Sequence, residues 1–173
     1  MSWKLLYVLF MIIFYTSSCS SPSDRWQAME KIVKQHAKHS KKSDSLKLTG
    51  LGDGTEEKKK YYQISIDYSA IGEVDVDEAR RIYIRTLDRA INLMDSSESV
   101  RPFLTNYPST PLNVDLTIEF YSQPYQDPPP GYVAIISMAK EKIIYKGAKD
   151  REFYDLLRET VEEAREKLRN ELH

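Results

Sequence analysis

A strict alternation of apolar and polar residues is the feature that most constrains the fold of this chain. It is clearest from Leu112 to Phe120, where apolar side chains take every second position and Asn, Asp, Thr or Glu take the positions between. Successive side chains of a strand point to opposite faces of a sheet, so this segment predicts a strand with one buried and one solvent-exposed face. Tyr62 to Tyr68 alternates in the same way. The chain is therefore expected to build a sheet that is covered on one side only.

The rest of the C-terminal part supplies helices and a hairpin. Apolar residues recur every three to four positions from Ala79 to Met94, after an acidic start at Asp75 to Glu78 that is typical of a capped helix. Residues 132–138 and 142–146 predict a β-hairpin. The inward positions of a predicted final helix, which begins after Gly147-Ala-Lys-Asp150, are Phe153, Leu156, Leu157, Thr160, Ala164 and Leu168.

These elements predict one globular α+β domain at residues 61–173. Its order is strand, helix, three strands, helix, and we expect a mostly antiparallel four-stranded sheet with two helices packed on one face. Nearly all periodic apolar positions lie in this part, so residues 59–173 are expected to fold alone. The order of the strands in space does not follow from the pattern.

Residues 19–60 have the composition of a tether. A basic amphipathic helix is expected at about 24–39, with Trp26 on its apolar face and Lys31, Lys34 and Lys38 largely off that face. Two arrangements remain open: the helix lies on an anionic membrane surface, or its apolar stripe packs on the domain. The glycine-rich residues 40–60 are expected to form a flexible linker.

The N-terminus has the layout of a signal peptide, with Lys4 before the apolar run Leu5–Phe14 and small residues up to Cys19. The run is shorter than the roughly 20 residues that a membrane-spanning helix needs. An uncleaved transmembrane anchor is one alternative, and an ordinary secretory peptide is the other.

The stretch Thr16-Ser17-Ser18-Cys19 resembles the lipobox of bacterial lipoproteins. The resemblance covers residues 1–20 and implies removal of residues 1–18, with Cys19 linked to diacylglycerol and usually N-acylated. Thr16 departs from the pattern, in which an aliphatic residue is usual. Ser20 is compatible with export to an outer membrane, where the bacterium has one. The resemblance thus implies a protein of the bacterial cell envelope that is attached to a membrane through Cys19.

A second resemblance lies in the middle of the chain. The segment Arg101-Pro-Phe-Leu-Thr-Asn-Tyr-Pro108, followed by the alternating strand, resembles uncharacterised small lipoproteins of intracellular bacteria. This resemblance spans some forty residues and implies no activity.

Charge and cysteine content exclude several classes of function. The formal net charge is −1 with a single cysteine, so nothing in the composition favours nucleic acid as a partner, and Cys19 leaves the domain without disulfides or a thiolate nucleophile. His36 and His39 are three residues apart, but no third ligand accompanies them, and we expect no metal or other cofactor.

Catalytic chemistry has weak support. Asp67, Asp115 and Glu119 would share the wet sheet face, where two carboxylates could divide acid and base roles, but a pleated open face seldom shifts their pKa values apart. Pairing with Lys142 or Lys146 is the simpler expectation. We therefore expect no catalytic residues and no enzyme.

Tyrosine is abundant, with 12 copies, and amphipathic rings suit protein or glycan surfaces. The candidates for contact with a partner, at strand ends and in the two proline-rich loops, are Tyr61, Tyr107, Tyr121, Tyr125 and Tyr132. The leading hypothesis is a non-enzymatic envelope lipoprotein that presents its domain to a protein, peptide or glycan. The alternatives are an envelope-polymer hydrolase that uses the sheet carboxylates and a structural protein that lies on the membrane surface.

Overall fold

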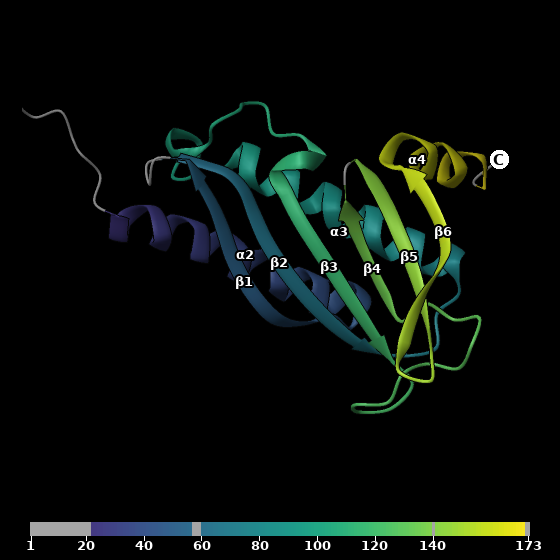
Figure 1. The fold of residues 1–173 in the computed structure, drawn as a ribbon. Helices are drawn as coiled ribbons and strands as arrows, with labels where there is room; N and C mark the ends of the chain where they lie inside the picture. The colour runs from purple at the N-terminus through teal and green to yellow at the C-terminus, as the bar shows by residue number, and fades with distance from the viewer. Residues whose placement is uncertain (1–21, 57–59, 140, 172–173) are drawn as a thin grey trace, which may run out of the picture.

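The structure is a computed structural model that describes residues 22–56, 60–139 and 141–171 (Figure 1). Its elements in chain order are α2 (Pro22–Asp44), β1 (Lys47–Glu56), β2 (Lys60–Ile71), α3 (Val76–Ser96), the 3₁₀ turns η1 (Arg101–Phe103) and η2 (Pro111–Asn113), β3 (Val114–Tyr121), β4 (Ile135–Ala139), β5 (Lys142–Lys149), β6 (Glu152–Thr160) and α4 (Val161–Asn170). The predicted signal peptide and Cys19 lie outside the described residues.

The strands form one six-stranded sheet whose spatial order follows the chain, from β1 at one edge to β6 at the other. Strands β2 and β3 are parallel, because α3 carries the chain from the end of one to the start of the other. All other neighbouring strands are antiparallel. The α+β class is therefore confirmed, but the sheet is mixed and has more than the four strands predicted.

The central elements form close to where the residue pattern predicts them, although Leu112 belongs to the turn η2 and is exposed, and β4 begins at Ile135. In β3 the residues alternate between buried and half-buried positions along the whole strand. Helix α3 begins at its predicted cap, because the Asp75 carboxylate accepts a hydrogen bond from the Glu78 amide at 2.8 Å. Strands β4 and β5 pair as the predicted hairpin.

One face of the sheet is covered by helices and the other is open (Figure 1). Helices α2 and α3 lie against the covered face, and α4 packs beside α3 with Val161 and Ala164 in the same core. The core is continuous from Met29 in α2 to Ala164 in α4. The helices therefore lie on the same side of the sheet as predicted, within the described part of the chain.

The expected linker is wrong for most of its length. Residues 47–56 form edge strand β1, which pairs with β2 over nine residue pairs with two register shifts. Glycine-rich composition suggested a flexible segment, but Leu46 is fully buried, and Leu48 and Leu51 pack against the core. These apolar positions stabilise the strand despite its glycines. The core therefore extends across the boundary that the sequence placed at residue 60.

The tether helix is part of the domain. It extends to Asp44 rather than ending near residue 39, and its inward residues Met29 and Val33 are fully buried. The sequence left two arrangements open for the apolar stripe. In the structure, the stripe packs on the domain. Trp26, at the side of that stripe, is 42% exposed.

The predicted long final helix is also wrong in its first half. Residues 152–160 form β6, and only residues 161–170 are helical. Thr160 and Glu163 form a capping box that starts the helix, with the Thr160 amide donating to the Glu163 carboxylate at 2.7 Å. The spacing of Phe153, Leu156 and Leu157 matched a helical stripe by coincidence, and Phe153 is exposed on the edge strand.

Candidate binding surface on the open sheet face

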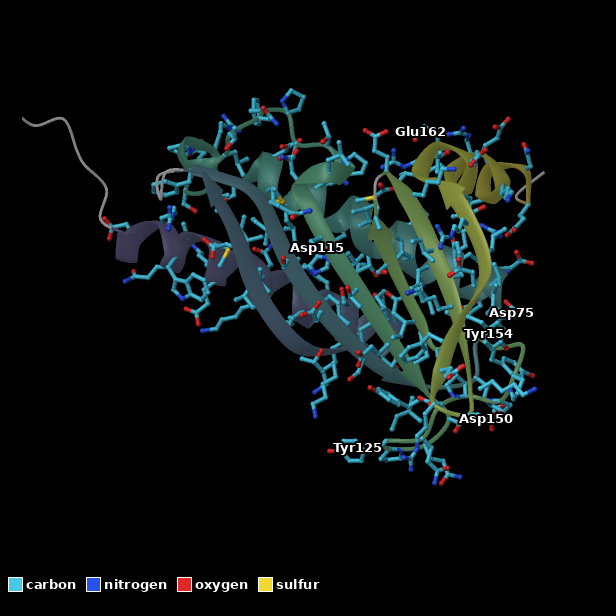
Figure 2. All side chains as sticks on the ribbon, in the orientation of Figure 1. Asp75, Asp115, Tyr125, Asp150, Tyr154 and Glu162 are labelled. Atoms are coloured by element: carbon cyan, nitrogen blue, oxygen red, sulfur yellow. The ribbon has the colours of Figure 1, made fainter. Side chains whose placement is uncertain are left out.

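On β2 and β3 the open face of the sheet is polar and its side chains are mostly small, whereas β4 and β5 add Ile135 and Ile144 to the same face. On β2 it carries Ser65, Asp67 and Ser69, and on β3 Asp115, Thr117 and Glu119. Register pairs Ser65 with Asp115, Asp67 with Thr117 and Ser69 with Glu119, so these side chains form rows across the two strands. Figure 2 shows Asp115 among the side chains of this face, and no helix or strand of the described residues lies over it.

The three carboxylates predicted on this face are there, but they lack the expected lysine partners. Asp115 accepts from the Ser65 hydroxyl at 3.2 Å and Glu119 from the Tyr121 phenol at 2.7 Å. No ion pair joins these carboxylates to Lys142 or Lys146 within the described residues, because those lysines lie on β5 with β4 between them and β3. Their pairing is therefore a correction.

The Asp67 side chain lies against the edge strand. A Cβ atom at Gly50 would be 2.2 Å from Asp67 Oδ2, so any larger residue at position 50 would require the Asp67 side chain to move. Partial burial raises the pKa of Asp67, and the nearby charges of Asp115 and Glu119 raise it further. The carboxylate is therefore held in a partly desolvated, mutually repelling group.

A cavity of about 520 Å³ opens at the end of this face, where β1 begins and β2 and β3 end. Lys47 and Glu119 contribute opposite charges to it, and Ser45, Thr49 and Ser69 contribute hydroxyls. Ile71, Pro124 and the rings of Tyr121 and Tyr125 provide apolar surface. A site with this mixture can hold a ligand that has both polar groups and an apolar face.

The turn after β3 closes one side of this cavity. The Ser122 amide donates to the Gln126 carbonyl at 3.0 Å and the Gln126 amide donates to the Gln123 carbonyl at 3.0 Å, so residues 122–126 form a tight turn. Tyr125, within that turn, has a φ of 62° and is 98% exposed. Left-handed backbone is uncommon for a bulky residue. The turn thus holds an aromatic ring in water at the lower end of the sheet (Figure 2).

Tyr121 lines the cavity and is held in place by a hydrogen bond. Its phenol donates a hydrogen bond to Glu119, and this bond, together with burial and the charge of Glu119, raises the pKa of Tyr121 to about 12. The phenol therefore stays protonated at neutral pH. Since its proton is directed at Glu119, the phenol oxygen remains free to accept a hydrogen bond from a ligand.

The other predicted tyrosines lie elsewhere. Tyr107 is 55% exposed in the segment before β3, where the Arg101 guanidinium lies 4.8 Å from its ring centroid, so it is at the opposite end of β3 from the cavity. Tyr132 is exposed in the connection to β4 and does not line the cavity. The side chain of Tyr61 lies outside the described residues. The structure thus brings together only Tyr121 and Tyr125.

Several cavity residues were not found from the sequence. Lys47 and Thr49 belong to β1, which composition assigned to a linker, and Ile71 at the end of β2 is 64% exposed. Leu46, Leu48 and Leu51 were the available signal for this strand, because a solvated linker has no reason to carry them.

The two histidines of α2 are in different environments. His36 is fully buried, whereas His39 is exposed beside α3, where it lines a cavity with Arg85 and Asp88. His36 Nε2 lies 2.9 Å from the Thr86 carbonyl and Nδ1 lies 2.6 Å from the Tyr68 hydroxyl, so a neutral ring donates to the first and accepts from the second. Both nitrogens are occupied. No cluster of three metal-ligating side chains is present in the described ranges.

A second buried polar cluster joins α3 and α4 to the sheet. Glu159 accepts hydrogen bonds from Arg80 Nε at 2.7 Å, Tyr145 at 2.6 Å and Lys167 at 2.6 Å. Burial alone would raise the pKa of Glu159, but these bonds outweigh burial and hold its pKa below the ordinary value. Glu159 is buried and forms ion pairs with Arg80 and Lys167, so this cluster is a structural ion network.

None of the helices in the described part of the chain is long and apolar enough to cross a membrane. No protein-family model matches the chain, and no curated protein and no solved structure is significantly similar to it.

Proposed function

We propose that this chain is a lipid-anchored protein of the bacterial cell envelope whose α+β domain binds a protein, peptide or glycan in the cavity beside Tyr121 and Tyr125. The observation that carries the proposal is the exposed Tyr125 ring at the mouth of a 520 Å³ cavity. Exposed aromatic rings beside hydrogen-bonding groups are typical of recognition surfaces, because they supply contact area with little loss of side-chain entropy on binding.

The composition of the cavity favours binding over catalysis. Glu119 is the one carboxylate among the residues that line it, and it already accepts a hydrogen bond from the Tyr121 phenol. General acid–base chemistry requires two groups whose environments separate their pKa values around a substrate. Asp67 and Asp115 lie further along the open face and do not line the cavity. The hydrolase hypothesis therefore has less support than the binding hypothesis.

The position of α2 bears on how an anchor would hold the domain. Cys19 lies three residues before Pro22, the first residue of α2. Since α2 belongs to the core, no long flexible tether separates an acylated Cys19 from the folded domain. We propose that the domain is held close to the membrane surface, because a connection of three residues spans at most about 10 Å.

Mass spectrometry of the membrane fraction tests the anchor. The mature chain is expected to begin at Cys19 and to carry diacylglycerol, and Cys19→Ser is expected to block both lipid attachment and signal removal because the thiol is the acyl acceptor. A mature wild-type chain that begins at another residue, without lipid, would contradict the anchor.

Photocrosslinking in the native envelope tests the binding site. A photoreactive phenylalanine analogue at position 125 is expected to capture a partner, whereas the same analogue at position 107, which is also exposed but lies at the far end of β3, is the matched control. Capture at 125 that is lost with Tyr121→Ala would support the cavity. Equal capture at both positions, or capture at 107 alone, would contradict it.

A further inference from the structure

The outer side of α2 carries a row of exposed lysines. Helical positions advance about 100° per residue, so its five lysines fall within an arc of roughly 100°. The centre of that arc is opposite the buried stripe of Met29, Val33, His36 and Ser40. This basic row consists of Lys31, Lys34, Lys38, Lys41 and Lys42, all of them exposed.

Acidic residues of the helix compensate little of this charge. Glu30 pairs with Lys34 at 2.9 Å at one margin of the row. The carboxylate of Asp44 is almost fully buried and interacts with Arg85 and Arg89 of α3 instead. The row therefore presents a net positive surface along about 16 Å of helix, at 1.5 Å per residue.

We propose that this basic row lies on an anionic lipid surface and thereby turns the open face of the sheet away from the membrane. The apolar stripe of α2 packs on the covered face of the sheet, so the lysines on the opposite side of the helix point outward from the helix layer. A membrane in contact with the row leaves the other face of the sheet free. This inference rests on the proposed lipid anchor for the membrane location of the protein.

A lipid surface fits the row better than a shaped partner does. Lysine is a point charge on a flexible stem, which suits a fluid layer of headgroups, whereas arginine is favoured where planar bidentate contacts are made. The row contains no arginine. The predicted acylation site precedes α2 by three residues, so the membrane would already be adjacent to this helix.

Binding to vesicles tests the row without the lipid anchor. The chain from Ser20 onward contains every residue of the described fold, and it is mixed with vesicles of phosphatidylcholine, with or without phosphatidylglycerol. It is expected to bind only the anionic vesicles. Binding should weaken with added salt, because the Debye length falls from about 10 Å at 0.1 M to about 3 Å at 1 M.

Two matched variants locate the contact. In K31Q/K34Q/K38Q the membrane partition coefficient is expected to fall roughly hundredfold, since each lysine contributes about 1 kcal/mol, or about fivefold. The control K142Q/K149Q/R169Q removes three exposed charges from β5 and α4 and should bind as the wild type does. No anionic preference, or an equal loss in both variants, would overturn the proposal.

Two single-cysteine spin labels test the orientation. A nitroxide at Gln27, on the outer side of α2, is expected to lose contact with an aqueous nickel complex when anionic vesicles are added, whereas one at Thr117 on the open face should not. Shielding at Thr117 would overturn the orientation. Because these chains carry no acyl group, a negative result in these experiments does not bear on the lipid anchor or on the cavity. Equally, a finding that Cys19 is not acylated does not bear on vesicle binding by the basic row.

Discussion

The tyrosines on the two faces of the sheet are in opposite environments. On the covered face Tyr68 and Tyr145 of the sheet and Tyr83 of α3 are fully buried, and each phenol makes a hydrogen bond to a buried group. At the end of the open face Tyr125 is almost entirely in water and Tyr121 is half-buried. The same residue type therefore stabilises the core on one face and is available to a partner on the other.

The difference separates stability from recognition. Covered-face substitutions should lower the free energy of unfolding and affect binding only through loss of the fold. Open-face substitutions should weaken binding and leave the free energy of unfolding nearly unchanged. The following changes test that division, from the largest expected effect to the smallest.

Removal of α2 and β1 is expected to abolish folding, which replaces the expectation that residues 59–173 fold alone. Met29, Ile32, Val33 and Leu46 would be lost from the core, and burial of each such side chain contributes about 1.5–3 kcal/mol. The sum approaches the whole 5–15 kcal/mol stability typical of a domain. A cooperative denaturant transition of residues 59–173 would contradict this account of the covered face.

Glu159→Ala is expected to destabilise the domain by about 3–5 kcal/mol, because it leaves the buried Arg80 guanidinium without its main partner. Glu152→Ala, on the exposed start of the same strand, is the control and should change stability by less than about 0.5 kcal/mol. Chemical denaturation measures both. Equal effects would show that the Glu159 network does not stabilise the fold.

Leu116→Ala and Thr117→Ala compare the two faces within one strand. Leu116 is fully buried and its truncation should cost about 2–5 kcal/mol. Its neighbour Thr117 points to the open face, so Thr117→Ala should change stability by about 0.5 kcal/mol or less. Similar losses from both would mean that the open face is packed against something in the folded protein.

Mild acid should destabilise the covered face through His36. Burial lowers the pKa of His36 from 6.5 to about 4, with smaller contributions from the charges of Arg89 and His39. Between these values the unfolded chain binds a proton that the folded chain does not, so stability falls as pH falls from about 6.5 to 4, by up to about 3 kcal/mol.

The variant His36→Gln isolates this effect from the titration of carboxylates. The difference in unfolding free energy between wild type and variant should shrink as the pH falls through this window. A difference that is constant with pH would show that His36 is not held neutral in the core.

Tyr125→Ala should have the smallest effect on stability, within about 0.5 kcal/mol, because the ring has almost no packing to lose. Thermal unfolding compares it with the wild type. A loss above 1 kcal/mol would place Tyr125 in the stabilising structure and remove it as a free recognition residue.

The sequence predicted the elements whose periodicity is unambiguous. Helix α3 and strands β2 and β3 combine clean spacing with caps or turns at their ends, and Tyr121 and Tyr125 were identified at the end of β3. Strand β1 was missed because three glycines outweighed its leucines, and β6 because its apolar spacing also fits a helix. The cavity depends on β1 meeting the ends of β2 and β3, which is a tertiary contact that no local pattern contains.

The central claim is that the covered face stabilises the fold while the open face binds a partner. Hydroxyl-radical footprinting of the protein in its own envelope, compared with the purified protein, tests this claim most directly. Tyr121 and Tyr125 are expected to be protected from oxidation in the envelope and reactive after purification, while the exposed Tyr107 remains reactive in both. Protection of Tyr107 without protection of Tyr125, or no difference between the two samples, would contradict the assignment of the cavity as the binding site.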